Sequence, residues 1–218
     1  MTDYKTVLLT DGEFTGMIRT LRSLSEPPRI LGFVSSGTAA HTAFLDGYAV
    51  APDWRDKDYL PFLIDYVKRE HVDLIFPVIT SSLEFMAQNA DKIREETGAV
   101  LISSPAESIH IANNKVRLFE TLSHTELSKF ITPFAAVNTV GEMRKAVKAF
   151  EEQGISCISK PACGENAEGF IKYVTGEEYA EKRLLGQASN LATLSSFHCL
   201  SAESPLPESR LIMPYLPG

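Results

Sequence analysis

The feature that most limits the fold is a regular alternation of short apolar runs with longer amphipathic segments through the first half of the chain. Apolar runs of strand length occur at 6–10, 29–36, 48–52, 72–79 and 98–103. Helix-like spacing of apolar residues occurs between them, at 16–24, 58–71 and 81–96. Apolar strands separated by helices are typical of a parallel sheet covered on both faces. The sequence therefore predicts an N-terminal α/β unit.

The second half of the chain has a different pattern, in which neighbouring strands are not all separated by helices. We expect strands at 134–138, 156–162, 169–174 and 210–216, and helices at 112–127, 139–154 and 177–186. A short polar loop joins the second and third of these strands, which is typical of an α+β unit. A chain of 218 residues is long enough for two compact units. We place their boundary near residues 104–113.

The charge and the apolar content of the chain limit its partners. The formal net charge is −7 and the isoelectric point is near 5.3, so a nucleic-acid surface, which needs a basic stripe, is not expected. Local donors can still hold the phosphates of a nucleotide. The N-terminus has no signal-peptide pattern, and no apolar stretch approaches the roughly 18 residues that a membrane span needs. These patterns predict a cytoplasmic protein that binds neither nucleic acid nor membrane.

The cysteines and histidines give no sign of a metal site. Three cysteines, Cys157, Cys163 and Cys199, are an odd number and form no CxxC pair. The five histidines are scattered along the chain. Buried or half-buried thiols in a reducing compartment are the expected state. We therefore predict no metal ligands within this chain.

Two turns in the first half could border a ligand. TDGEFTG follows the first strand and opens a helix, as a dinucleotide-binding turn does, but it has only Gly12 and Gly16, with Phe14 between them. Cofactor phosphates need close approach of the backbone, so a structural turn is favoured. ITSSLE, at the end of the 72–79 strand, has a Ser81–Glu84 spacing that predicts a capping box. Its polar residues fit a capped helix or a ligand rim equally well.

The segment ISKPACGENAEGFIKYV carries a stronger combination. Lys160 lies at the end of a strand, and Gly164 and Gly169 border the loop that follows. A glycine-containing loop can bring backbone N–H groups over a phosphate chain, and a lysine ammonium can bind phosphate oxygens. A simple hairpin with a solvent-exposed lysine would have the same sequence features. In addition, Glu165 and Glu168 would repel phosphate unless their side chains point away from it.

The order of several short motifs narrows these alternatives. Lys115 on a helix, a strand after TP, an amphipathic helix, the SKP strand, the glycine loop and a final MPYLPG follow one another. This series resembles the ATP-grasp superfamily, in particular the branch that is similar to the large subunit of carbamoyl phosphate synthetase. The resemblance covers nearly the whole chain. It implies a Rossmann-like pre-ATP-grasp domain at 1–112 and a partial α+β ATP-grasp lobe, the first lobe with its hinge, at 113–218.

The resemblance also implies roles for individual residues. Lys115 and Lys160 match the two basic positions that contact ATP phosphates, and Gly164 to Gly169 match the loop that closes over them. Met213, Pro214, Tyr215 and Leu216 match the hinge that reads the adenine edge. There the Pro214 carbonyl accepts from the amino group and the Leu216 N–H donates to the ring. Pro214 has no N–H, but its role requires only the carbonyl. Ile158, Ile171 and Met213 would sandwich the ring.

The chain departs from the family in its loop and at its end. The loop GENAEG has two carboxylates and Asn166 where the family commonly has more glycine and serine. The family's magnesium ligands, and an arginine that steadies an acyl phosphate, lie in a second lobe beyond the hinge, so the catalytic residues are not identifiable here. We expect ATP and Mg²⁺ as cofactors, and small carboxylate and amine substrates. We also expect the chain as written to be inactive by itself; a homodimer is compatible with the sequence.

Three hypotheses remain at this stage. The chain is either a portion of an ATP-dependent carboxylate–amine ligase or a short nucleotide-binding protein that is non-catalytic or completed by a partner. A third, less favoured alternative is an unrelated enzyme that binds a nicotinamide cofactor at TDGEFTG. Nothing in the sequence identifies the carboxylate.

Overall fold

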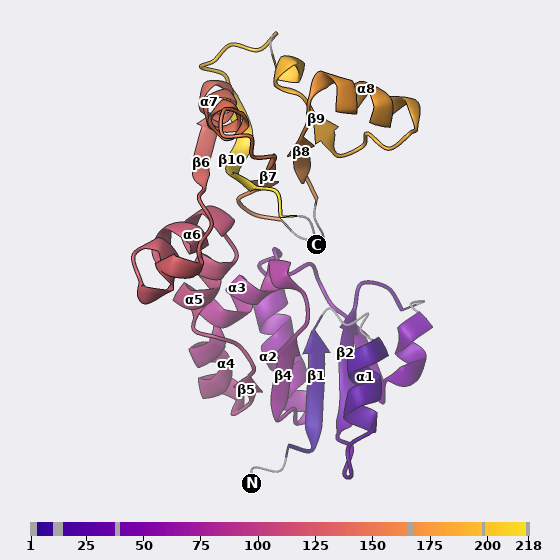
Figure 1. Ribbon diagram of the computed structural model, residues 1–218. Helices are drawn as coiled ribbons and strands as arrows, with labels where there is room; N and C mark the ends of the chain where they lie inside the picture. The colour runs from indigo at the N-terminus through magenta and orange to yellow at the C-terminus, as the bar shows by residue number, and fades with distance from the viewer. Residues whose placement is uncertain (1–3, 11–14, 38–39, 165–167, 198, 217–218) are drawn as a thin grey trace. The chain divides into compact units, whose positions relative to one another are not determined.

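The chain forms two units, Met1–His110 and Ile111–Gly218, and each is described by itself. The computed structural model describes residues 4–10, 15–37, 40–164, 168–197 and 199–216. Figure 1 shows the helices and strands of both units along the chain.

The first unit is built on a five-stranded parallel sheet in the order β3-β2-β1-β4-β5 (Figure 1). Each strand is short, and each pairs in parallel with its neighbours, as apolar runs separated by helices predict. The strands are β1 (Thr6–Thr10), β2 (Arg29–Val34), β3 (Gly47–Val50), β4 (Leu74–Pro77) and β5 (Val100–Leu101).

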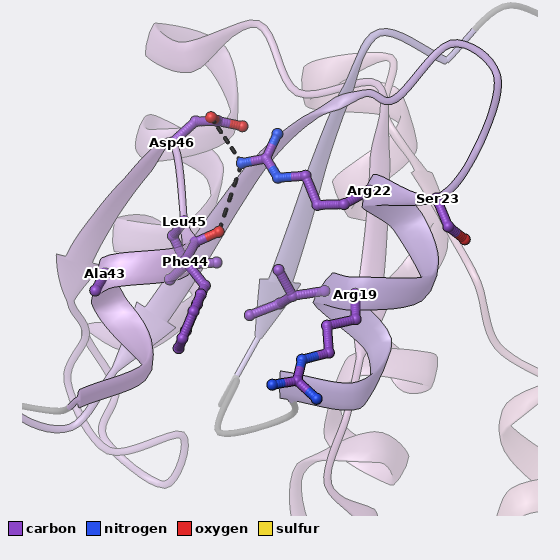
Figure 2. A pocket seen from close by; sticks show the side chains of 8 residues that line it. Arg19, Arg22, Ser23, Ala43, Phe44, Leu45 and Asp46 are labelled. Atoms are coloured by element: carbon purple, nitrogen blue, oxygen red, sulfur yellow. Dashed lines mark hydrogen bonds and ion pairs between the residues drawn. The ribbon is translucent and has the colours of Figure 1, made fainter.

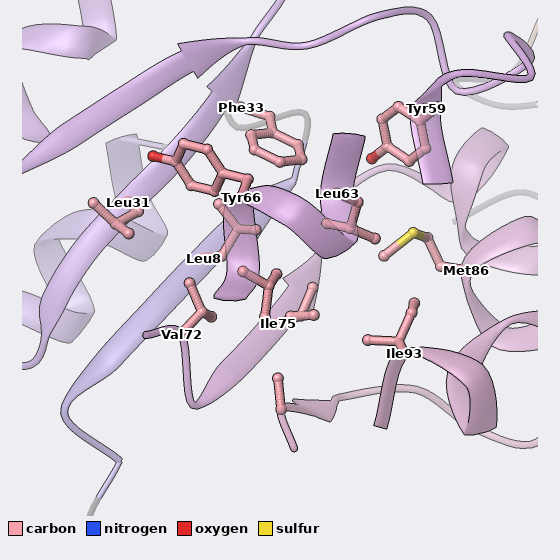
Figure 3. Close-up of a cluster of buried hydrophobic side chains, with 12 residues drawn as sticks. Leu8, Leu31, Phe33, Tyr59, Leu63, Tyr66, Val72, Ile75, Met86 and Ile93 are labelled. Atoms are coloured by element: carbon pink, nitrogen blue, oxygen red, sulfur yellow. The ribbon is translucent and has the colours of Figure 1, made fainter. Parts of the chain in front are cut away.

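Helices cover both faces of this sheet because its strands are apolar on both sides. Leu8 belongs to a cluster with residues of α2 (Tyr59–Glu70), α3 (Thr80–Gln88) and α4 (Ala90–Thr97), as Figure 3 shows. Val7 and Leu9 point to the other face and pack with Ile18 of α1 (Thr15–Arg22). Alternate residues of a strand face opposite ways, so a continuous apolar run serves both cores.

The predicted helix at 81–96 is wrong in two details. It is two helices, α3 and α4, that meet at Asn89, whose side-chain amide donates to the Phe85 carbonyl. The predicted Ser81–Glu84 capping box is absent, since α3 begins one residue earlier and its N-cap position is Ile79, without a side-chain cap. Local spacing of Ser and Glu fits a cap but does not fix where the helix starts.

The second unit contains a mixed five-stranded sheet in the order β6-β10-β7-β8-β9. β10 is antiparallel to both β6 and β7, β8 is antiparallel to β7, and β9 is parallel to β8. The strands are β6 (Ala135–Thr139), β7 (Cys157–Pro161), β8 (Ile171–Tyr173), β9 (Leu191–Ala192) and β10 (Pro205–Pro214). Helix α7 (Val140–Glu151) lies against β6 and β10, and α8 (Gly176–Leu184) follows β8 (Figure 1).

The region before the second sheet differs from the single helix predicted at 112–127. It contains α5 (Ala106–Ala112), α6 (Lys115–Ser123) and the 3-10 turn η2 (Glu126–Phe130); another 3-10 turn, η1, spans Ala40–Phe44. The break comes at Asn114, whose side-chain oxygen accepts from the Val116 and Arg117 N–H groups. Asparagine is a strong N-cap because it satisfies N–H groups that have no partner within the helix.

None of the helices in the described parts of the chain combines the length and the apolar character that crossing a membrane requires.

Candidate functional site

The predicted site residues lie on the second sheet and beside the end of β7. One face of this sheet packs against α7 through Cys157, Tyr173 and Ile212, which belong to one buried cluster with Val147 and Phe150. Because successive residues of a strand point to opposite faces, the residues between these lie on the other face. The sheet therefore has one apolar side, which packs against α7, and a second side, described next, that also carries lysines.

The second side carries two lysines among apolar residues. Met213 pairs with Ile158, and Ile158 pairs with Lys172, so these three form one row across β10, β7 and β8. In the next row Lys160 pairs with Leu211. We call this side of the sheet the lysine face, defined by Ile158, Lys160, Lys172, Leu211 and Met213. It brings Lys160 and Met213, two residues predicted from widely separated segments, to the same side of the sheet.

Lys115 joins this group from helix α6. It is the first residue of the helix that Asn114 caps, and its N–H donates to the Ala162 carbonyl at 2.7 Å. Its ammonium donates to the Gly164 carbonyl at 3.0 Å. The cap and these two bonds place the Lys115 ammonium at the start of the glycine loop, directly after β7.

The glycine loop is fixed at its second end by a nearly buried arginine. Gly169 has a φ of 66°, and a Cβ there would lie 2.6 Å from Pro161 Cγ, so both backbone and space require glycine. Arg210, whose side chain is 12% exposed, donates to the Gly169 carbonyl and, at 3.1 Å, to Ser159 Oγ. Residues 165–167 of this loop lie outside the described residues. Arg210 thus ties the loop to the α7 side of the sheet.

The predicted hinge begins within β10, whose last two residues are Met213 and Pro214. Pro214 pairs with Cys157, and the Tyr215 N–H donates to the Ser156 carbonyl at 2.8 Å. The Leu216 side chain is 68% exposed. The tetrad Met213–Leu216 therefore runs from the lysine face past the start of β7; the Pro217 and Gly218 that follow lie outside the described residues.

The proposed sandwich of three apolar residues is wrong for Ile171. Ile171 pairs with Ser159 and packs with the cluster that covers the α7 side, so it faces away from Ile158 and Met213. Lys172, the next residue, occupies the lysine face instead. Residue-by-residue alternation along FIKYV would have assigned these two side chains correctly.

Electrostatics differ between the two sides of the sheet. On the α7 side, burial raises the pKa of the Cys157 thiol to about 11, with a smaller contribution from the Glu151 charge. Burial also raises the pKa of Tyr173, whose hydroxyl donates to Ser159 Oγ at 3.3 Å. These two groups stay neutral at physiological pH, and Arg210 is the cationic side chain that bonds Ser159 beside them, whereas the other side carries Lys160 and Lys172.

Potential metal ligands do not cluster within the parts of the chain that the structure describes, where no group of three His, Cys, Asp or Glu side chains could hold an ion.

The two turns considered in the first unit give less support for a ligand site than the lysine face does. Residues 11–14 of TDGEFTG lie outside the described residues. At the other turn, Glu84 contacts His110 through Oε1 and Nδ1 at 2.7 Å, and Ser82 Oγ donates to the Ile79 carbonyl at 3.4 Å. The first contact joins α3 to α5 and the second lies within the first turn of α3, which favours the structural alternative for ITSSLE.

A surface pocket in the first unit lies between α1 and η1 (Figure 2). Its arginine Arg22 binds Asp46 at 2.7 Å and the Phe44 carbonyl at 3.5 Å. The hydrogen bond from Arg22 holds the pKa of Asp46 below its ordinary value. Arg22 therefore already has an anionic partner, and Arg19 is the second arginine that lines this pocket.

Comparison with known proteins gives a family match and several structural matches. Residues 19–102 match the family described as PylC-like, N-terminal domain. No curated protein matches the chain at a significant level.

Solved ATP-grasp ligases share the fold. N5-carboxyaminoimidazole ribonucleotide synthetase, solved as its ADP complex, superposes with a TM-score of 0.62 at 13% identity, over 100% of this chain and 49% of that chain. The biotin carboxylase domain of 2-oxoglutarate carboxylase from Hydrogenobacter thermophilus, in complex with MgADP, ADP and bicarbonate, gives 0.56 at 18%, over 99% and 45%. L-amino acid ligase from Bacillus licheniformis gives 0.57 at 12%, over 100% and 46%.

These matches establish the fold. The chain shares with them a Rossmann-like parallel sheet followed by an α+β unit, so the fold class inferred from the motifs is confirmed. It spans about half the length of the solved structures that it matches.

Proposed function

We propose that the chain is the N-terminal portion of an ATP-dependent carboxylate–amine ligase. In this proposal residues 1–112 are the pre-ATP-grasp domain, and residues 113–218 are the first lobe and hinge that bind ATP. The observation that carries it is the lysine face, where Lys160 and Met213 share one side of the sheet and Lys115 binds the adjoining loop at Gly164. The solved neighbours with bound ADP support the same ligand class.

The base and the phosphates of a nucleotide each have a counterpart among these residues. The partly exposed Met213 would contact the purine ring, next to the buried Ile158 with which it pairs. The Pro214 carbonyl would accept from the adenine amino group, and the Leu216 N–H would donate to the ring. Lys115 and Lys160 would bind phosphate oxygens, together with backbone N–H groups of the loop between Gly164 and Gly169. ATP supplies the phosphoryl group that activates a carboxylate, and these residues orient it.

The described residues do not fit Mg²⁺. Magnesium is held mainly by carboxylate oxygens, and no acidic cluster occurs among the described residues. No reaction step is therefore assigned to a metal bound by this chain alone. We propose that the rest of the whole protein supplies the metal ligands and completes the site. There the carboxylate would be converted to an acyl phosphate, and an amine would then displace the phosphate. The proposal also includes a cytoplasmic location and no ATP turnover by the isolated chain.

The same observation favours a second candidate. A nucleotide-binding surface without metal ligands also suits a non-catalytic binder, or a subunit whose site a partner chain completes. Both candidates share the lysine face. They differ in whether the metal ligands and catalytic groups come from the same chain, from a partner chain or are absent.

Nucleotide titration tests the shared part of the proposal. The methyl signals of Met213 and Ile158 should shift on addition of ATP or ADP, and those of Leu8 and Ile75, buried in the first unit, should not. NADH at equal concentration serves as the control ligand. Stronger binding of NADH than of ATP, or ATP shifts confined to the first unit, would replace this proposal with the nicotinamide alternative.

A further inference from the structure

Lys172 is a third lysine beside the candidate nucleotide site, and sequence reasoning gave it no role. It lies on the lysine face in the row of Ile158 and Met213. Its side chain is 24% exposed, so much of its length is covered by neighbours. A half-buried lysine needs partners for its ammonium group.

The ammonium group of Lys172 has two partners of different kinds. Its Nζ lies 4.6 Å from the centroid of the Tyr215 ring and 3.4 Å from Glu178 Oε1. Glu178 lies in the first turn of α8, where its N–H bonds the capping Thr175 hydroxyl. The Glu178 carboxylate neutralises the Lys172 ammonium. In this Lys172 differs from Lys115, whose ammonium donates to the Gly164 carbonyl and has no carboxylate partner among the described residues.

Tyr215 is the residue at the middle of the hinge. Its N–H is bonded to the Ser156 carbonyl at 2.8 Å, which fixes its main chain to the start of β7. Its ring is held by the Lys172 ammonium, which fixes its side chain to β8. The Pro214 carbonyl and the Leu216 N–H are attached directly to Tyr215 through peptide bonds. Their directions therefore depend on how Tyr215 is held.

We infer that Lys172 is a positioning residue for the hinge: its contacts with Tyr215 and Glu178 orient the main chain that reads the purine base. This inference rests on the proposed function. The role differs from that of a phosphate ligand, because it acts through Tyr215 and concerns the base end of the nucleotide.

Comparison of a nucleoside with a nucleotide separates the two roles. We expect Lys172→Met to weaken adenosine and ATP by the same factor, about two- to five-fold, because a cation–π contact of this kind contributes that much. Lys172→Arg keeps the cation and should restore most of the affinity. Glu178→Gln should have a smaller effect of the same kind. Dissociation constants come from the Met213 methyl shifts during titration.

A double-mutant cycle tests the path through Tyr215. Tyr215→Leu should weaken both ligands as Lys172→Met does, and the double variant should be no weaker than Tyr215→Leu alone. Lys145→Met, at an exposed lysine of α7, is the matched control and should leave both affinities unchanged. In the chain without ligand, the ε-methylene protons of Lys172 should shift upfield from the Tyr215 ring and lose that shift in Tyr215→Leu. This signal shows that the contact exists, and an unchanged methyl signal of Ile212, buried in the second unit, shows that each variant is folded.

Three results would overturn the inference. Weaker ATP binding with unchanged adenosine binding would make Lys172 a phosphate ligand. Unchanged binding of both ligands, with the unaltered chain binding normally, would leave it without a role at the hinge. If the losses of affinity in the two single variants add up in the double variant, Lys172 does not act through Tyr215. Absence of both adenosine and ATP binding by the unaltered chain would instead overturn the proposed function, and the inference with it.

Discussion

The two sheets of this protein use their faces differently. In the first unit all five residues of β1 are buried, and apolar clusters cover both faces. Among the described residues of the second unit, one face has a comparable cluster, and the other carries Lys160 and Lys172. A sheet that is covered on both faces offers a ligand only its strand ends, whereas a sheet with lysines on one face also offers that face. This difference agrees with the proposal that the second unit binds the nucleotide.

The largest expected effect comes from the core of the first unit. Phe33 is fully buried, and its ring centroid lies 5.0 Å from that of Tyr66 and 6.3 Å from that of Tyr59. Phe33→Ala should lower the free energy of unfolding of this unit by about 3–5 kcal/mol, because it leaves a cavity. Fluorescence of Trp54, the single tryptophan, reports the transition.

Phe130→Ala is the control for this prediction. Phe130 is 72% exposed, so its loss should change the free energy of unfolding by no more than about 0.5 kcal/mol. Equal effects of the two variants would contradict the assignment of the Phe33 cluster as the stabilising core.

The next effect contrasts the buried α7 side of the second sheet with exposed segments outside its strands, through thiol reactivity. Burial raises the pKa of Cys157 to about 11, so at neutral pH it has about 100-fold less thiolate than a thiol with a pKa of 9.0. Cys163 and Cys199 are exposed. Alkylation followed by mass spectrometry should modify these two first, and modification of Cys157 should become faster as the pH rises toward 11.

The same experiment can report on the ligand. Cys163 precedes Gly164, the residue whose carbonyl binds Lys115, so saturating ATP should slow its alkylation. Cys199 is the matched control and should react at the same rate with and without ATP. Equal slowing of both thiols would point to a general effect of the nucleotide on the protein rather than to a bound ligand at the loop.

Removal of the Lys160 charge should have a moderate and selective effect. Hydrogen bonds to charged groups contribute about 1.5–3 kcal/mol, so Lys160→Met should weaken ATP binding about 10- to 100-fold and adenosine binding much less. Lys145→Met provides the charge-matched control. Calorimetric titration of both ligands measures the difference, and equal losses for ATP and adenosine would show that Lys160 does not bind phosphate.

The smallest effect concerns the helix that covers the apolar side of the second sheet. Thr139 and Glu142 form a reciprocal capping box at the start of α7, and Thr139→Ala should cost about 1 kcal/mol in denaturant unfolding. Hydrogen bonds from the Asn138 and Thr139 N–H groups hold the pKa of Glu142 below its ordinary value. Its contribution to stability is therefore present above its unfolded-state pKa and is lost as the pH falls through its folded-state pKa.

Glu142→Gln provides the matching pH experiment. The variant should be less stable than the unaltered chain at neutral pH, and the difference should shrink on acidification. A difference that stays constant down to low pH would show that the carboxylate charge contributes nothing to the cap.

The sequence predicts most strands of this fold because their apolar runs are long enough for burial to determine them. β1 is found at Thr6–Thr10, the bounds that TVLLT indicates. Helix breaks at Asn89 and Asn114 were missed, since an asparagine within a helical pattern signals a break only when its side chain bonds the backbone. Only the hydrogen bonds in the structure show this.

The candidate site was accessible from the sequence only in part. Lys115, Lys160 and the hinge follow one another in a recognisable order, so motifs identify them. Arg210 and Lys172 belong to no motif, and their partners are distant in sequence: Gly169 for Arg210 and Tyr215 for Lys172. Contacts of this kind depend on strand register, which the sequence of either strand alone does not define.

Intermolecular nuclear Overhauser effects between ADP and methyl-labelled protein test the central claim most directly. The account predicts contacts from the adenine H2 and H8 protons to the methyl groups of Met213 and Ile158, and none to the first-unit methyl groups of Ile18 and Leu45. Contacts to Ile18 and Leu45, which line the pocket between α1 and η1, with none to Met213, would contradict it.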